Sequence, residues 1–325
     1  MPKNGKEVNR IISDALSMRS SSSITAVTVN WNKPLETVRC IKSLKEGGVE
    51  DITIYVVDNG SNGNDIDLIR REVPDAFVFE MGKNLGYVKG INFGISKAME
   101  SRPSFILVIN NDAYGSRGFI TELLKGMERH QNAGIVGPKI LYPDGRRIWY
   151  AGGEFNEWLG YSRHPMMDSE DDGDQIDEKV DFVTGCAMLV RREVFEEVGL
   201  FDQDYDIYAE DLDFCLRAAE RGYESWYIPS SVVYHEVSSS TGVAGSNLMT
   251  PFRAYHYARN MFILTSKRIK GGKFITCIIG QFAIRFPYYF FMIALQKIRG
   301  AYLAYIRGII DGLKFVVGGR EPVED

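Results

Sequence analysis

The sequence predicts an α/β fold with a mainly parallel sheet, followed by a C-terminal helical extension. Three observations predict this fold. Short apolar runs alternate with amphipathic helical stretches between residues 24 and 109, polar side chains follow directly after several of these runs, and the composition changes after Lys273. The chain has 325 residues, of which 45% are apolar and 12% aromatic, so it can bury a substantial core.

The predicted elements follow one another in the order strand, helix, strand. A parallel neighbour is reached through a crossover connection, usually a helix, so this alternation indicates parallel strands. The predicted strands are residues 24–29, 52–57, 77–80 and 105–109, and the helices between them are residues 35–44, 65–73 and 87–99.

Composition also limits the function and the cellular setting. The net charge of −5 and the pI of about 5.6 argue against sequence-independent binding to nucleic acid, which needs a basic surface. The four cysteines are far apart and form no CxxC pair, so we expect neither a zinc site nor disulfides, and a reducing, cytoplasmic setting. Residues 1–23 have no apolar run long enough for a secretory signal, and we expect a flexible leader or a short helix there.

Polar clusters follow three of the predicted strands, at residues 30–32, 58–61 and 110–112. In open α/β sheets, ligands bind at the carboxyl ends of the strands, so we expect these clusters along one edge. No GxGxxG motif follows the first strand and no GxxxxGK[ST] motif occurs. The sequence therefore predicts a ligand that is not held by a glycine-rich phosphate loop.

The residue types in these clusters suit a pyrimidine nucleotide. The Asp58 carboxylate can accept a hydrogen bond from the N3–H of the base, and Trp31 can stack on the base. Asp112 can hold a divalent cation that neutralises a diphosphate. The alternatives are that Asp58 closes an Asx-turn at the strand end and that Trp31 is a core aromatic residue.

Carboxylates crowd the start of a predicted amphipathic helix further along the chain. Glu210, Asp211 and Asp213 lie among apolar residues at helical spacing. A helix N-terminus favours negative charge, so the alternative is a helix cap on an acidic surface. The lone His235 follows downstream, and we expect it to share one cleft with this helix start and with Asp112.

Short motifs occur in a fixed order along the chain, at residues 29–32, 57–61, 84–87 with Asn92, 110–112, 185–191, 199–202 and 210–213. Together they resemble the inverting GT-A glycosyltransferases of family 2, with the rhamnosyltransferases and galactofuranosyltransferases as the nearest branch. The resemblance implies a GT-A fold, which is a nucleotide-diphospho-sugar transferase fold with a Rossmann-like sheet. We expect a leader over residues 1–23, a GT-A catalytic domain over 24–265 and a C-terminal amphipathic helical region over 266–325.

The resemblance implies roles for individual residues in binding the nucleotide-sugar donor. Asp58 would read the uracil or thymine, Asn30 and Trp31 would line the base pocket, and Asn84 and Lys89 would lie near the ribose or diphosphate. The implied donor-binding residues are Asn30, Trp31, Asp58, Asn84, Gly86, Lys89, Asn110, Asn111, Asp112, Gly185 and Arg259.

The resemblance also implies a metal site. Asp112 matches the metal-binding acid of the DXD-type motif, but Asn110 stands where that motif has its first acid. His235 matches the position where relatives have a metal-binding histidine, the alternative being a half-buried histidine at a strand end. With one carboxylate, we expect Mg²⁺ or Mn²⁺ to be held weakly and completed by diphosphate oxygens and water.

Glycosyl transfer requires that an acceptor hydroxyl lose its proton while it attacks the anomeric carbon. We expect Asp211 to be the general base and Glu210 to orient it or to hydrogen-bond the acceptor, with Asp213 structural. Arg259 would meet the diphosphate or an anionic acceptor, unless it is a surface arginine. A single displacement of this kind inverts the anomeric configuration.

The expected activity is transfer of a sugar, such as rhamnose, galactofuranose or an N-acetylhexosamine, from UDP or dTDP to a hydroxyl of a glycan or lipid-linked acceptor. Such an enzyme belongs to polysaccharide biosynthesis. Two alternatives stay open: a non-catalytic nucleotide-sugar binding protein, which the Asn110 substitution motivates, and a nucleotidyltransferase, which shares the sheet and the metal-binding acids.

Residues 274–295 are rich in Phe, Ile and Tyr but are interrupted by Gln281, Arg285 and Pro287. A central arginine is costly in a spanning helix, so we expect an interfacial helical hairpin, peripheral on the inner face of the cell membrane. The alternative is an amphipathic helix pair that covers the catalytic domain or a homodimer interface.

Overall fold

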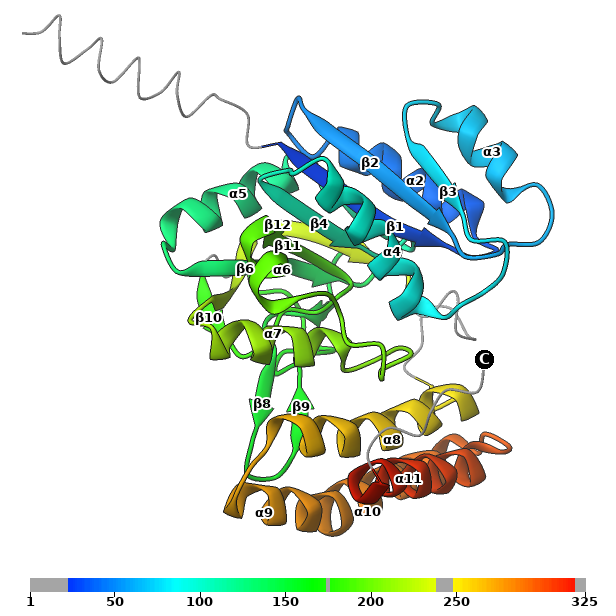
Figure 1. The fold of residues 1–325 in the computed structure, drawn as a ribbon, viewed down its shortest axis with the longest axis vertical. Coiled ribbons are helices and arrows are strands. Elements are labelled where there is room, and N and C mark those ends of the chain that lie inside the picture. The colour runs from blue at the N-terminus through cyan, green and yellow to red at the C-terminus, as the bar shows by residue number, and fades with distance from the viewer. Residues whose placement is uncertain (1–22, 174–175, 238–247, 319–325) are drawn as a thin grey trace, which may run out of the picture.

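The computed structural model describes residues 23–173, 176–237 and 248–318 (Figure 1). The leader that we expect over residues 1–23 lies, apart from Ser23, outside the described residues. In the remainder, one large sheet with helices on both faces forms the upper body, and a layer of helices lies beneath it (Figure 1).

The sheet begins as predicted, with parallel strands. They are β1 (Ile24–Asn30), β2 (Ile52–Asp58), β3 (Phe77–Glu80) and β4 (Phe105–Ile109), and each boundary lies within one residue of the sequence prediction. The strand order in space is β3-β2-β1-β4, so the carboxyl ends of β1, β2 and β4 lie along one edge of the sheet.

The second half of the sheet is mixed. β11 (Ala187–Arg191) runs antiparallel to both β4 and β6 (Ala133–Leu141), and β12 (Glu224–His235) is parallel to β6. Near the cavity described below, β5 (Ala113–Gly115) pairs with the end of β12. Shorter strands complete the sheet and a separate hairpin: β7 (Ile148–Tyr150), β10 (Glu178–Val180), and the hairpin β8 (Glu154–Asn156) with β9 (Tyr161–Arg163).

Helices cover both faces because alternate residues of each strand point to opposite sides. Ala26 packs in the core under α2 (Pro34–Lys45), α3 (Asp65–Glu72) and α5 (Phe119–Arg129). Its neighbour Val27 packs under α4 (Tyr87–Glu100), α6 (Arg192–Val198) and α7 (Glu210–Glu220). Helix α4 lies directly on β1 because Gly94 has no side chain: a Cβ there would lie 2.3 Å from Val27 Cγ1.

The C-terminal helices form a second layer. They are α8 (Pro251–Arg268), α9 (Gly272–Gly280), the π-helix η1 (Gln281–Arg285), α10 (Phe286–Gln296) and α11 (Ala301–Gly318). Helix α8 lies between the sheet and the others (Figure 1). Its Met261 and Ile263 join the core under the sheet, whereas Ala258 and Phe262 pack with α10 and α11. The domain boundary expected at residue 265 therefore falls within the last turn of α8.

The segment Gly272–Gln296 is, among the described residues, the one helical stretch long and apolar enough to cross a membrane. Only 17% of its most apolar window is buried inside the protein, so its apolar side chains face outward. The exposed large side chains here are Ile275, Ile279, Phe282, Ile284, Tyr288, Phe290, Phe291 and Leu295.

Candidate functional site

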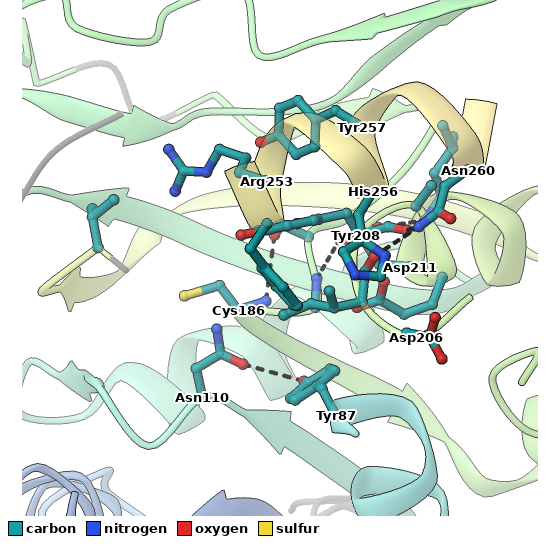
Figure 2. Close-up of a pocket in the computed structure, with 18 of the residues that line it drawn as sticks. Tyr87, Asn110, Cys186, Asp206, Tyr208, Asp211, Arg253, His256, Tyr257 and Asn260 are labelled. Carbon is teal, nitrogen blue, oxygen red and sulfur yellow. Dashed lines mark hydrogen bonds between the residues drawn. The ribbon is translucent and has the colours of Figure 1, made fainter. Parts of the chain in front are cut away.

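A cavity of about 980 Å³ opens at the carboxyl ends of β1, β2 and β4 and continues past α7 and α8 to the C-terminal helices. Its volume lies at the upper end of the range for small-molecule sites. Figure 2 shows Tyr87 and Asn110 on one side, Arg253, Tyr257 and Asn260 of α8 on the other, and Tyr208 and Asp211 between them. Asp112 and Asp211 both line this cavity, as the expectation of one cleft requires.

At the carboxyl ends of β1 and β2, a hydrogen-bond network lies behind the wall of the cavity. Asn30 Nδ2 donates to Asp58 Oδ1 at 2.8 Å, and Ser61 N donates to Asp58 Oδ2 at 3.0 Å. Asn30 and Asp58 are buried and are not lining residues, so Asp58 makes the Asx-type turn contact that sequence reasoning left open. Trp31 and Asn59 line the cavity, and Trp31 is 38% exposed, so it is not a core residue.

The loop before α4 is fixed by Asn59. Its Nδ2 donates to Asn84 Oδ1 at 3.1 Å, and its Oδ1 accepts from Leu85 N at 3.0 Å. Gly86, at φ +88°, has the backbone conformation that glycine favours. Asn84 and Gly86 line the cavity, whereas Lys89 is exposed and does not.

Tyr87 is a cavity residue that sequence reasoning did not single out. Its hydroxyl donates to Asn110 Oδ1 at 3.2 Å, which joins the start of α4 to the cluster after β4. Burial raises the pKa of Tyr87 well above its ordinary value, and the charges of Glu210 and Asp211 raise it further. The phenol therefore stays protonated and near these carboxylates.

Strand pairing brings Asp112 and His235 together. His235 pairs with Ala113 in the β5–β12 ladder, so His235 lies beside Asp112, the residue before Ala113. His235 Nε2 is 3.2 Å from Asp112 Oδ1, and both residues line the cavity while being less than 8% exposed. Burial lowers the pKa of His235, but Cys186 and Asp112 outweigh this effect and raise it well above its ordinary value.

The Asp112–His235 pair fits part of a divalent metal site. Two ligands in neighbouring octahedral positions at about 2.1 Å from a cation lie about 3 Å apart, close to the observed separation. Within the ranges that the structure describes, no group of three or more His, Cys, Asp or Glu residues could hold a metal. Further ligands would therefore have to come from other oxygens, such as those of a substrate or water.

The start of α7 is held in a strained conformation. Tyr208 and Ala209 have φ of 68° and 70°, which non-glycine residues adopt rarely. Asn260 of α8 fixes this turn, because its Nδ2 donates to the carbonyl oxygens of Ile207 and Tyr208, each at 2.8 Å. The turn directs the following carboxylates toward the cavity.

Asp211 is anchored by backbone donors, whereas Glu210 is not. Gly185 N donates to Asp211 Oδ2 and Leu212 N to Asp211 Oδ1, both at 2.8 Å. Glu210 Oε2 is buried without a hydrogen-bond partner among the described residues. Burial raises the pKa of both carboxyls, and the Asp211 charge adds to the effect on Glu210, whose pKa is raised well above its ordinary value.

Two other charged residues stabilise the surroundings of the cavity. Asp213 is fully buried and accepts from Arg217 at 2.8 Å and from Arg268 at 2.6 Å, which agrees with the structural role expected for it. Arg259 Nη1 donates to Asp204 O at 3.1 Å and lies 3.6 Å from Asp206 Oδ2. Arg259 is not a lining residue, and it braces the loop before the strained turn.

The family model described as "Glycosyl transferase family 2" matches residues 25–199. N-acetylglucosaminyl-diphospho-decaprenol L-rhamnosyltransferase of Mycobacterium tuberculosis is 29% identical over 238 residues, which cover 67% of this chain and 77% of the relative. The dTDP-rhamnosyl transferase RfbF of Shigella flexneri is 26% identical over 304 residues, which cover 92% of this chain and 98% of the relative.

Solved structures share the fold. S. aureus TarS in complex with UDP-GlcNAc has a TM-score of 0.60 at 13% identity, covering 90% of this chain and 81% of that one. The mannosyltransferase PcManGT from Pyrobaculum calidifontis, in complex with GDP-Man and Mn²⁺, has a TM-score of 0.55 at 15% identity, covering 92% and 88%. These likenesses confirm the predicted GT-A fold.

Proposed function

This chain belongs to glycosyltransferase family 2, and on that premise we propose that it transfers L-rhamnose or a related sugar from a dTDP or UDP donor to a hydroxyl of a lipid-linked glycan, with inversion. The observation that carries the proposal is that Asp112 and Asp211 share one cavity. The similar relatives named rhamnosyltransferases favour rhamnose, and the diphospho-decaprenol in one of their names favours an acceptor whose sugar is joined to a lipid through a diphosphate.

The strand-end side of the cavity supports donor binding. Trp31 and Asn59 present an aromatic face and an amide where the base would lie. Asp58, immediately behind them, orders this wall through its bonds to Asn30 and Ser61. Each of its oxygens keeps a lone pair that a base N3–H could use after a small shift of the turn.

Asp112 and His235 would hold the divalent cation, which when bound supplies positive charge to the diphosphate leaving group. The imidazole favours Mn²⁺ over Mg²⁺, because nitrogen ligands suit transition metals better. Asn110 would still contribute to this wall, since Tyr87 fixes its amide oxygen.

Asp211 is the proposed general base and Glu210 its partner. Two backbone N–H groups donate to Asp211, whereas Glu210 Oε2 is buried without a hydrogen-bond partner among the described residues, so the pair would hold its first proton on Glu210 and leave Asp211 ionised. A raised pKa also makes the Asp211 carboxylate a better proton acceptor. The two backbone donors fix its direction without removing its remaining lone pairs.

A panel of nucleotide-sugars tests this function. We expect dTDP-rhamnose, or another dTDP- or UDP-sugar, to raise the melting temperature only when Mn²⁺ or Mg²⁺ is present, since a ligand that binds the native state stabilises it. Asp112→Asn should abolish the metal-dependent part, and Asp177→Asn, near the distant His130, serves as a control. Stabilisation by nucleoside triphosphates, with release of pyrophosphate, would favour a nucleotidyltransferase instead.

We also propose that the exposed face of α9, η1 and α10 rests on an anionic membrane surface. Apolar side chains cover this face, and the exposed cations around it include Lys270, Lys297, Arg299 and Arg307. The change Phe291→Glu should reduce flotation with vesicles containing phosphatidylglycerol, whereas Leu35→Glu on distant α2 should not. Equal flotation of both variants would contradict this surface.

A further inference from the structure

The π-helix η1 interrupts the apolar helix in the lower layer at the point where it meets the cavity. π-helical turns are rare and occur often at functional sites. Gln281, at its start, is buried and donates through Nε2 to Gly160 O at 2.6 Å. A Cβ on Gly280 would lie 2.5 Å from Leu159 O, so the β8–β9 hairpin tip contacts this turn closely and fixes it.

The last residue of η1, Arg285, lines the cavity. Its guanidinium donates to Gln281 Oε1 at 3.2 Å and to Tyr257 O at 3.3 Å, and lies 5.2 Å from the centroid of the Tyr289 ring. All of these partners are neutral, and no described carboxylate lies within ion-pair distance of Arg285. Arginine is always charged in proteins, so the cavity wall carries a positive charge with bonding capacity left over.

Aromatic rings connect the carboxylates to this arginine. Tyr208 lies two residues before Glu210, and its ring packs edge-on against the ring of Tyr257, with the ring centroids 4.8 Å apart. The ring centroids of Tyr257 and Tyr289 are 6.1 Å apart, and all three tyrosines line the cavity. In Figure 2, Arg253 and Tyr257 lie on one side of the cavity, and Tyr208 and Asp211 lie between them and Tyr87. Arg253, one turn before Tyr257 on α8, brings a second guanidinium to the same wall.

Beyond Arg285, the helix surface becomes apolar and exposed. Tyr288 is 57% and Phe290 is 45% exposed, and both flank the half-buried Tyr289. Moving outward from Asp211, the cavity thus presents a carboxylate, aromatic rings and an arginine, and an exposed apolar surface lies beyond the arginine on the same helical segment. A lipid-linked sugar has the same order of groups: a hydroxyl, a sugar ring, a phosphate and a hydrocarbon chain.

We propose that Arg285, with Tyr257 and Tyr289, forms a subsite for the phosphate of an acceptor that is a lipid-linked sugar phosphate. The inference rests on the proposed function, because it assigns the acceptor side of the same cavity. The sugar lies against Tyr208 and Tyr257 with its hydroxyl toward Asp211, and the hydrocarbon chain leaves over α10. The arginine that makes a spanning helix costly thereby has a use inside the cavity.

The test separates acceptor phosphate from donor phosphate. Farnesyl diphosphate is the probe, titrated by calorimetry into the full-length protein with UDP and Mn²⁺ at saturation, so that the donor site is filled. We expect wild type to bind it and Arg285→Gln to bind it about tenfold more weakly or worse, since a charge-assisted hydrogen bond is lost. Arg285→Lys should recover part of the affinity, and the affinity for UDP should stay unchanged in both variants.

Matched controls keep the outcome interpretable. Arg71→Gln removes the same charge from α3, where the side chain is 71% exposed, and should change neither affinity. Farnesol, which lacks the anion, should bind wild type and Arg285→Gln equally. Equal binding of farnesyl diphosphate to wild type and Arg285→Gln, no binding to wild type, or a parallel loss of UDP affinity would overturn the subsite. Failure of UDP to bind wild type would instead count against the proposed function.

Discussion

Replacing Asp211 by Asn separates the chemistry from binding and from folding. The change keeps the volume of the side chain but removes the charge and replaces one acceptor oxygen by an NH₂ group. Two backbone donors, Gly185 N and Leu212 N, each lie 2.8 Å from a carboxylate oxygen. An amide can accept from only one of them, so one buried N–H loses its partner.

The magnitudes favour a folded but inactive variant. An unsatisfied buried donor costs about 1–3 kcal/mol, which a domain with about 5–15 kcal/mol of stability tolerates. Loss of the buried Asp211 charge, which burial disfavours, offsets part of this cost. Loss of a general base lowers turnover by about 10²- to 10⁴-fold. Donor affinity should not change, because Trp31 and Asn59 lie at the other end of the cavity.

The assay compares kcat for transfer from the donor found in the panel with the Kd of the nucleotide diphosphate from calorimetry. Glu210→Gln is the matched control: it replaces the neighbouring carboxyl by an amide, and Glu210 Oε2 has no hydrogen bond to lose among the described residues. We expect a clearly smaller loss of kcat from it than from Asp211→Asn. If Asp211→Asn turned over within tenfold of wild type, or lost donor affinity in step with kcat, Asp211 would not be the base.

Three further changes test the surroundings of this site. Asn260→Ala removes the donors to two part-buried carbonyls, so we expect a loss of about 1–3 kcal/mol in urea unfolding and at least tenfold in kcat, whereas Thr265→Val on the same helix should cost about 1 kcal/mol and spare kcat. The folded-state pKa of Glu210 is raised above its ordinary 4.5, so the wild-type free energy of unfolding should fall relative to that of Glu210→Gln as the pH rises above about 4.5, and should level off once Glu210 has ionised. If the free energies of unfolding of the two proteins, measured in urea, changed in parallel across that pH range, the burial cost would be contradicted. Gly94→Ala would bring a Cβ to 2.3 Å from Val27 Cγ1, so its melting temperature should fall by the equivalent of about 1–3 kcal/mol, and an unchanged value would show that α4 can shift.

The parallel half of the sheet could be predicted from the sequence almost to the residue. Strands such as Ile24–Asn30 and Phe105–Ile109 are buried on both faces, so they appear as uninterrupted apolar runs that end at polar turns. The antiparallel insertion of Ala187–Arg191 between β4 and β6 could not be predicted, because strand order depends on pairing between distant segments.

The candidate site divides in the same way. Asp112 and Asp211 follow recognisable local patterns, a strand end and a helix start, and both line the cavity. The residues contributed by the lower layer have no such signal. Arg259 and Asn260 are adjacent on one helix, yet only Asn260 lines the cavity, because successive helical residues point about 100° apart. From the sequence, Arg285 is only an unfavourable charge in a membrane-spanning helix, because no local pattern predicts the π-helical turn that contains it.

Helix α8 belongs to two cores at once, one under the sheet and one with α10 and α11. Any pull or tilt imposed on the lower helices, for instance by seating on a curved lipid surface, would therefore be transmitted through Asn260 to the turn that aims Asp211. A more soluble variant should replace outward-facing residues such as Phe291 and keep the C-terminal helices. Ending the chain near residue 270 would remove Arg285 and Tyr289, which form part of the cavity wall.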